Sequence, residues 1–454
     1  MTQSDIIKTL SELVEKQAAQ ISALLVRVEN LEQELSFYKN RKNSGNSHIP
    51  PSVDLVKRNQ SLRKQSGKKA GGQQGHEGST LKFSATPDQI VNHIPDYCRL
   101  CGNDLEQIDA VSLNRRQVID IPIPAPICTE HRTFAKTCSC GHINKGEFPL
   151  NVNANVQYGS HIEALTAYLS VRQYMPFGRI QELYSRIMGL NISQGGIVGL
   201  LQRFTGKALP GYQEIKKGIE KAACLGTDET GAKINGNTHW FWTWQNEALT
   251  FITQSQSRGY KTIQATFPDG LPDVVLVHDR WAAHFRCEAY DHQICLAHLF
   301  RDLKYIDQVH QSDWARSLTS ILKQAIALNN KADYDPAGVG WGSAARNELE
   351  RSLMDLLQHK LPDKDKLAIK LQKKLRKISH HILCFLHYNN VPPDNNGSER
   401  AIRNIKVKQK VSGGFRSTSG ADGFAVLRSV IDTTIKSGKD VFYTLSLIAN
   451  LAAE

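Results

Sequence analysis

A change in hydrophobic periodicity near residue 222 constrains the fold most strongly. The segments 223–234, 238–245 and 249–254 alternate between apolar and polar residues, and short turns containing Asn separate them. Alternating segments joined by such turns predict an antiparallel meander of three strands.

The following residues, up to 308, alternate between strands and helices. We expect a short helix near 259–266, a buried strand at 274–278 and a shorter strand at 293–295, with a helix after each strand. Three antiparallel strands followed by this alternation is the order of a ribonuclease-H-like sheet. In that fold the first and fourth strands are neighbours.

Two aspartates belong to these neighbouring strands. Asp228 lies within the first strand, and Asp279 directly follows the fourth. The predicted fold therefore makes them face each other, and a divalent cation relieves the repulsion between two close carboxylates. Mg²⁺ is suited to such a site because it prefers oxygen ligands. Spacing alone leaves the ordinary alternative open, in which each Asp caps a loop.

Glu399 is the best candidate for the third carboxylate of a two-metal site. It falls in the first turn of a helix expected at 397–410, after a break rich in Pro and Asn. In phosphodiester chemistry one metal activates the attacking water or 3′-hydroxyl and the other stabilises the leaving oxygen. The basic residues that follow the acid are candidates for phosphate contacts: Arg400, Arg403, Lys406, Lys408 and Lys410.

Residues 6–38 carry an unbroken heptad pattern. β-Branched residues at a with Leu at d favour a parallel two-stranded coiled coil, and five heptads exceed an ordinary globular helix. The alternative is an amphipathic helix packed on its own domain. The a positions are Ile7, Val14, Ile21, Val28 and Leu35, and the d positions are Leu10, Gln17, Leu24, Leu31 and Tyr38.

The composition indicates in which compartment the protein works and which kind of partner to test. The 454 residues include nine cysteines, contain no long apolar run, and begin without a signal-peptide pattern. We therefore expect a cytoplasmic protein with reduced thiols and no membrane span. The formal charge of +12 makes a polyanion such as DNA the partner to test.

Two further segments suggest DNA contacts. Residues 41–80 are basic and rich in Asn, Ser, Gly and Pro, which predicts a linker that touches phosphates without reading sequence. Helices expected at 161–174, 178–188 and 193–204 resemble a helix-turn-helix, with Ser193 as N-cap. Gln194 would open the recognition helix. The alternatives are a merely solubilising linker and a three-helix bundle that binds nothing.

Cysteine pairs predict a structural zinc site. Cys98 and Cys101 precede a Gly, and so do Cys138 and Cys140. Four thiolates suit tetrahedral Zn²⁺. The second pair has one residue rather than two between its cysteines, so His131 or His142 is an alternative ligand. Reduced cysteines in a small β domain are the other interpretation.

Across almost its whole length the chain resembles transposases of the bacterial insertion sequence 66 family. The similar segments are Asn43-Ser44-Gly45-Asn46-Ser47, Pro50-Pro51-Ser52-Val53-Asp54, Gly71-Gly72-Gln73-Gln74-Gly75-His76-Glu77-Gly78, Thr227-Asp228-Glu229-Thr230, His278-Asp279 and Asp394-Asn395-Asn396-Gly397-Ser398-Glu399-Arg400-Ala401-Ile402-Arg403. The resemblance implies a ribonuclease-H-like catalytic domain with a helical insertion before Glu399, a catalytic triad of Asp228, Asp279 and Glu399, and a zinc-binding domain. It also implies a basic residue after the second Asp, a place that His298 and Arg301 occupy.

The sequence thus predicts a multidomain α+β protein, and the resemblance implies that it is bacterial and associated with the nucleoid. The protein would be a DDE transposase that binds two Mg²⁺, cleaves DNA at its terminal inverted repeats and joins the ends to target DNA. It would assemble as a homodimer or larger oligomer, with element-encoded accessory proteins as possible partners. The rivals are a DNA-binding repressor or architectural protein with an inactive catalytic fold, and a structure-specific nuclease. The expected domains are a coiled coil (1–40), a basic linker (41–92), a zinc-binding domain (93–150), a helical DNA-binding region (151–222), a catalytic core (223–308 and 388–440), a helical insertion (309–387) and a C-terminal helix (441–454).

Overall fold

The computed structural model describes residues 3–43, 46, 81–122, 124–331, 335–336 and 341–451. The chain divides into two compact units, one of residues 1–57 with 127–454 and the other of residues 58–126. The predicted basic linker lies mostly outside the described residues. None of the helices in the described part of the chain has the length and apolar character needed to cross a membrane.

A five-stranded mixed sheet organises the larger unit, in the order β5-β4-β3-β6-β7. The first three strands pair antiparallel, whereas β6 runs parallel to both β3 and β7. The predicted meander and the predicted adjacency of first and fourth strands are both confirmed. The strands are β3 (Cys224–Ile234), β4 (Asn237–Gln245), β5 (Thr250–Ser255), β6 (Leu271–His278) and β7 (Ala289–Ile294).

The last two strands begin earlier than the sequence predicted. Strand β6 starts at Leu271 rather than at 274, and β7 starts at Ala289 rather than at 293. Exposed Asp273 interrupts the apolar run of β6, and polar residues fill half of β7. Leu271 still pairs with Ala289, across an irregularity in the ladder that ends at Val275, because hydrogen bonds of the ladder do not depend on side-chain polarity.

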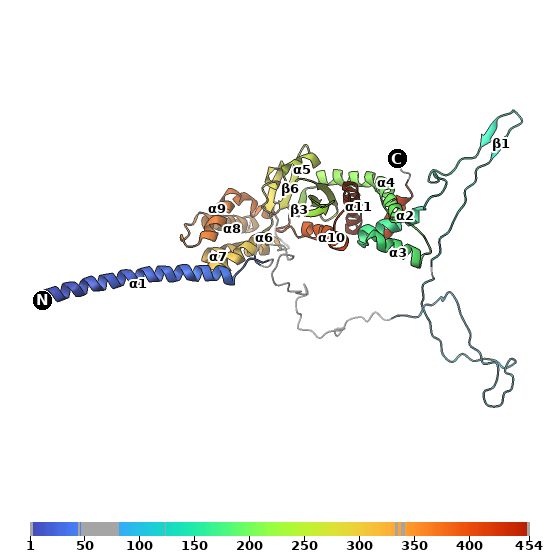
Figure 1. The fold of residues 1–454 in the computed structure, drawn as a ribbon, viewed down its shortest axis with the longest axis horizontal. Helices are drawn as coiled ribbons and strands as arrows, with labels where there is room; N and C mark the ends of the chain where they lie inside the picture. Colours follow the sequence, from blue (N-terminus) through green and yellow to red (C-terminus); the bar gives the residue numbers. More distant parts are fainter. Residues whose placement is uncertain are drawn as a thin grey trace. The chain divides into compact units, whose positions relative to one another are not determined.

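The two faces of the sheet are covered by different helices (Figure 1). In β6, Val274 and Leu276 belong to a core with α4 and α11, whereas Val275 and Val277 belong to a core with α6 to α9. This sorting follows from the period of two along a strand. The helices are α4 (Gln194–Glu220), α6 (Leu296–His310), α7 (Asp313–Asn329), α8 (Trp341–Gln358), α9 (Lys366–Lys377) and α11 (Thr418–Lys436).

Three helices before the sheet correspond to the predicted helix-turn-helix. They are α2 (Ser160–Ala167), which continues as a π-helical turn, α3 (Phe177–Ile187) and α4. The Ser193 hydroxyl accepts a hydrogen bond from Gly196 N at 3.0 Å, so the predicted N-cap is confirmed. Helix α4 extends past the expected end at 204, through Pro210, because Ala208, Ile215 and Ile219 continue its buried stripe.

The N-terminal segment forms one long helix, α1 (Gln3–Lys39). Its apolar side chains are largely exposed, and Val14 has 62% of its surface free. The C-terminal part of α1 is anchored: Ser36 Oγ donates to Val309 O of α6 at 2.8 Å, and the Phe37 ring meets His310 edge-on. Further along the helix, Glu29 forms an exposed ion pair with Lys364 at 3.6 Å.

Residues 81–150 contain little regular structure. A short hairpin joins β1 (Ala135–Thr137) and β2 (Ile143–Lys145), and Tyr97 forms an isolated bridge with Asp104. No residue described in this range is buried. The hydrophobic effect therefore contributes little to holding these residues in place.

Candidate active site

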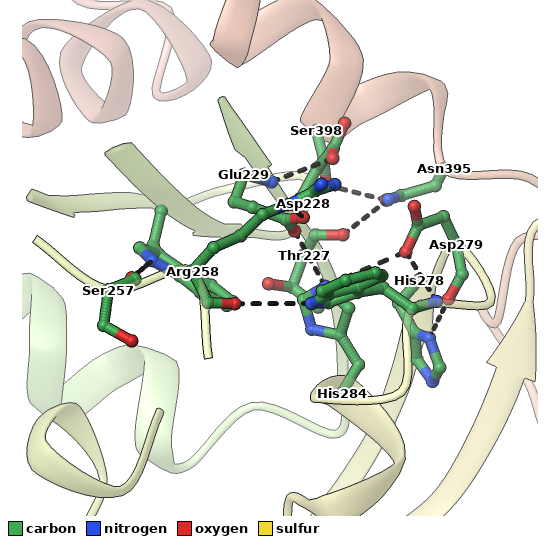
Figure 2. A network of polar contacts seen from close by, with 12 residues as sticks. Thr227, Asp228, Glu229, Ser257, Arg258, His278, Asp279, His284, Asn395 and Ser398 are labelled. Carbon is green, nitrogen blue, oxygen red and sulfur yellow. Dashed lines mark hydrogen bonds and ion pairs between the residues drawn. The ribbon is translucent and has the colours of Figure 1, made fainter. Parts of the chain in front are cut away.

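The register of the central strands brings Asp228 and Asp279 together. Gly226 of β3 pairs in parallel with Val277 of β6, and each Asp lies two residues beyond its paired position. The parallel pairing of β3 with β6 ends just before these two positions, so the two aspartates lie on neighbouring strands at the point where the strands part (Figure 2). Asp228 accepts a hydrogen bond from Glu229 N at 2.8 Å, and Asp279 accepts one from Trp281 N at 3.0 Å.

Glu399 reaches the same point from helix α10 (Asn396–Ser412), in its first turn. Its Oε1 lies 3.6 Å from His298 Nε2 and 3.8 Å from Arg301 Nη2, both on α6. That oxygen is buried and accepts no hydrogen bond. A buried carboxylate oxygen without a donor costs free energy unless a ligand satisfies it.

Burial and neighbouring carboxylates raise the pKa of both aspartates. Burial raises the pKa of Asp228 well above its ordinary value, and the charges of Glu229, Asp279 and Glu399 raise it further. Burial also raises the pKa of Asp279, and the charge of Glu229 adds to that effect. Mutual repulsion of this kind is what a bound cation relieves.

The chemistry of these donors therefore fits a hard divalent cation. All three are carboxylates, and one oxygen of Glu399 lacks a donor. As the side chains stand, no group of three or more His, Cys, Asp or Glu residues within the described ranges is arranged tightly enough to hold a metal ion. The three acids are neighbours, but their side chains are not arranged as ligands of one metal ion.

A second buried acid supports the site from the opposite face of β3. Glu229 accepts hydrogen bonds from Arg258 Nε at 2.9 Å and from His284 Nε2 at 3.0 Å. Burial alone would raise the pKa of Glu229, but the hydrogen bonds and charges of His284 and Arg258 lower it. His284 Nε2 also lies 3.9 Å from Asp279 Oδ1, so the imidazole links the two acids.

Asn395 holds helix α10 against β3. Its Nδ2 donates to Thr227 O at 2.7 Å, and its Oδ1 accepts from Ser398 Oγ at 2.7 Å. Thr227 precedes Asp228 and Ser398 precedes Glu399, so one buried amide connects the main chain beside both acids (Figure 2). A Cβ on Gly226 would lie 2.5 Å from Asn395 Oδ1, which explains the glycine at this close approach.

The predicted DNA contacts divide into exposed and buried side chains. Lys408 is 6% exposed and its ammonium lies over the Phe177 ring, which does not fit the prediction that it contacts DNA. The sequence did not indicate that Lys408 lies on the inner side of the helix, because the spacing of the charges does not determine which face of the helix is buried. The exposed members are Gln194, Arg400, Arg403, Lys406 and Lys410.

The cysteine pairs form two similar turns. Gly102 N donates to Cys98 O at 2.8 Å, and Gly141 N donates to Cys138 O at 2.8 Å. Both glycines have positive φ, which a turn of this tightness requires. Hydrogen bonds from Cys101 and Leu100 lower the pKa of Cys98, and hydrogen bonds from Cys140 and Ser139 lower that of Cys138. Within the described residues these thiols do not form a cluster of three potential ligands.

Some supporting residues had weak sequence signals. Glu229 and Asn395 stand inside the quoted motifs, but nothing in their spacing separates a supporting role from a loop or strand residue. Arg258 and His284 lie outside every motif and are recognisable only from the fold.

The comparison with protein families identifies the chain. The model of the transposase IS66 family matches residues 155–423, which is more than half of the chain and includes Asp228, Asp279 and Glu399. The site and the match together define a transposase. The chain belongs to the transposase IS66 family. No relative was found among curated protein sequences.

Proposed function

We propose that this protein is a DDE transposase with a ribonuclease-H-like core. It cleaves the ends of its own insertion sequence and joins the freed 3′-hydroxyls to target DNA. The observation that supports this most directly is the register of β3 and β6, which sets Asp228 and Asp279 side by side, with Glu399 and its donor-free oxygen in the first turn of α10. Acids gathered in this way repel one another, and a catalytic site uses that repulsion to attract cations.

In this proposal Asp228, Asp279 and Glu399 hold two Mg²⁺. The ions, when bound, supply activation of the attacking oxygen and stabilisation of the leaving oxygen. The protein's own contribution is placement: β3 and β6 fix the aspartates in register, and Asn395 fixes the start of α10. Arg301, 3.8 Å from Glu399, offsets its charge, and His298 lies 3.6 Å from the same oxygen.

DNA is the proposed partner, as terminal inverted repeats and as target. Exposed Arg400, Arg403, Lys406 and Lys410 project from the helix that begins beside the active site. Cations at this position contact phosphates next to the reacting one and position the strand without reading its sequence. Gln194, at the exposed start of α4, is the proposed base-reading residue.

Assembly and zinc complete the proposal. The exposed apolar seam of α1 supports a coiled coil with a second copy, so the synaptic complex contains at least two chains. Cys98, Cys101, Cys138 and Cys140 are the proposed ligands of a structural Zn²⁺, because both turns lower the pKa of a thiol and zinc binds thiolates. Element-encoded accessory proteins are further proposed partners.

The decisive experiment uses purified protein, Mg²⁺ and a labelled duplex of the DNA that flanks its gene. Cleavage followed by joining to a second duplex is the expected result. Cleavage without joining would favour a structure-specific nuclease. Binding without cleavage, in Mg²⁺ and in Mn²⁺, would favour a DNA-binding repressor or architectural protein.

A further inference from the structure

A stack of one cation and two indoles stands beside the catalytic acids. The Arg258 guanidinium carbon lies 4.6 Å from the centre of the Trp240 ring and 4.3 Å from that of Trp281. Arg258 Nε donates a hydrogen bond to buried Glu229, which holds the guanidinium between the two rings in place. Cation–π contacts of this kind hold both partners in one orientation.

Trp281 is the outer member of the stack and is fixed by its own hydrogen bonds. Its backbone N–H donates to Asp279 Oδ1 at 3.0 Å, and its indole Nε1 donates to Arg258 O at 3.3 Å. One indole face is covered by the guanidinium, yet 38% of the residue remains exposed. A rigid aromatic surface therefore stays open to solvent two residues from a catalytic acid.

The open part of the indole lies beside the acids, and its other face is held by the Arg258 guanidinium, so a ligand bound at the acids could stack on it. Nucleobases are flat and apolar on their faces, and stacking on an aromatic side chain contributes about 1–3 kcal/mol per base. The backbone hydrogen bond from Trp281 to Asp279 Oδ1 ties the turn that carries the indole to one of these acids. Bases inside an intact duplex stack on one another, so only an unpaired base is available.

We infer that Trp281 is a stacking platform for an unpaired nucleobase next to the phosphate that reacts. This inference rests on the proposed function, because it takes DNA as the substrate of the same site. The platform would hold a nucleotide that leaves the duplex at the cleaved end, and it would accept any base because stacking reads no hydrogen-bond pattern.

The test measures equilibrium binding of full-length protein to two single-stranded decadeoxynucleotides in Ca²⁺. One carries mixed bases, and the other has abasic sites at its four central positions. We expect the wild type to prefer the first by about five- to hundredfold, the range that loss of one stacked base predicts. Trp281→Ala should remove most of this preference, and Trp281→Phe should retain much of it.

Two controls separate the possible failures. Tyr443→Ala removes an exposed aromatic residue of α12 (Val441–Ala449), far from the stack in sequence, and should keep the wild-type preference. An undiminished preference in a folded Trp281→Ala protein would overturn the platform while leaving DNA binding intact. Absence of binding to both oligonucleotides and to the flanking duplex by wild-type protein would instead contradict the proposed function.

Discussion

The buried side-chain amide of Asn395 donates a 2.7 Å hydrogen bond to the main-chain oxygen of Thr227. This contact joins the strand that carries Asp228 to the helix that carries Glu399. Asn395 also accepts from Ser398 Oγ, so a single residue fixes both sides of the gap between the acids. Its role is one of position, since it touches the main chain rather than a carboxylate.

Replacing this amide should loosen the active site without abolishing DNA binding. Asn395→Ala removes the donor to Thr227 O and the acceptor of Ser398 Oγ, a loss of buried hydrogen bonds that costs about 1–3 kcal/mol. Cleavage should fall by about 10- to 100-fold, as is typical when residues that support metal ligands are removed. The half-saturating Mg²⁺ concentration should rise, and duplex binding should change little. Single-turnover cleavage across a Mg²⁺ titration and a gel-shift assay measure these quantities.

Two matched variants test this interpretation of Asn395. Asn396→Ala changes the exposed neighbour of the same type and should behave as the wild type. Gly226→Ala places a Cβ 2.5 Å from Asn395 Oδ1 and should reproduce the loss, whereas Gly206→Ala meets no atom within 4 Å and should not. An unchanged Mg²⁺ dependence in Asn395→Ala would show that the amide does not position Glu399.

The carboxylates themselves should be indispensable for cleavage. Asp228→Asn, Asp279→Asn and Glu399→Gln keep the shape of each side chain but remove a negative ligand, so we expect each to abolish strand cleavage. Duplex binding should remain or tighten slightly, because it depends on basic residues that these changes leave in place. Binding and nicking are scored on the same labelled end.

A control acid and a control cation sharpen that assay. Asp273→Asn alters an exposed acid of β6, the strand that Asp279 follows, and should cleave normally. Arg403→Ala should weaken binding and reduce its salt dependence while retaining partial activity at low salt. A carboxamide variant that cleaves at nearly the wild-type rate removes that residue from the triad.

The sequence predicted the sheet well because its signal is local. The residue pattern that predicted β3 to β5, and the turns between these strands, depend on residues close in the chain. The adjacency of Asp228 and Asp279 followed from strand order alone. Contacts such as those of Arg258 and His284 with Glu229 join residues far apart in the chain, so no periodicity reports them. The burial of Lys408 was missed for the same reason, since it depends on which face α10 turns to Phe177.

Helix α1 should assemble the protein through its apolar seam. Val14 and Val28 are 62% and 49% exposed, and an Asp at either position places a charge in the seam of the proposed coiled coil. The double variant Val14→Asp/Val28→Asp should sediment as a smaller species than the wild type. Ala19→Asp, at an outer heptad position, should leave the assembly intact. An unchanged sedimentation coefficient in the double variant would rule out this seam as the interface.

Zinc content tests the two cysteine turns. Protein purified without chelator should contain about one Zn²⁺ per chain, and Cys98→Ser should lose it because a hydroxyl replaces a thiolate ligand. Cys128→Ser removes an exposed thiol with no paired spacing and should retain the metal. Loss in Cys140→Ser but not in His142→Ala would identify the fourth ligand. Metal-free wild-type protein would count against the site.

Without divalent cations, Asp228 should destabilise the fold at neutral pH. Its pKa lies well above the ordinary value because of burial and of the charges of Glu229, Asp279 and Glu399. A carboxyl whose pKa rises on folding binds its proton more tightly in the folded state. Its contribution to the free energy of unfolding is therefore most favourable below the unfolded pKa of about 3.9. That contribution declines as pH rises through the native pKa.

Asp228→Asn removes that ionisation. At pH 7 in EDTA we expect the variant to exceed the wild type in free energy of unfolding by about 0.5–2 kcal/mol, as is common when a strained functional residue is replaced. The difference should shrink as pH falls toward 4, because the wild-type carboxyl then takes up its proton. Mg²⁺ should raise the melting temperature of the wild type more than that of the variant, since only a bound cation relieves the repulsion. Thermal melts of both proteins and of Asp273→Asn, with and without Mg²⁺, measure this, and a variant less stable than the wild type at pH 7 in EDTA would contradict the proposed electrostatics.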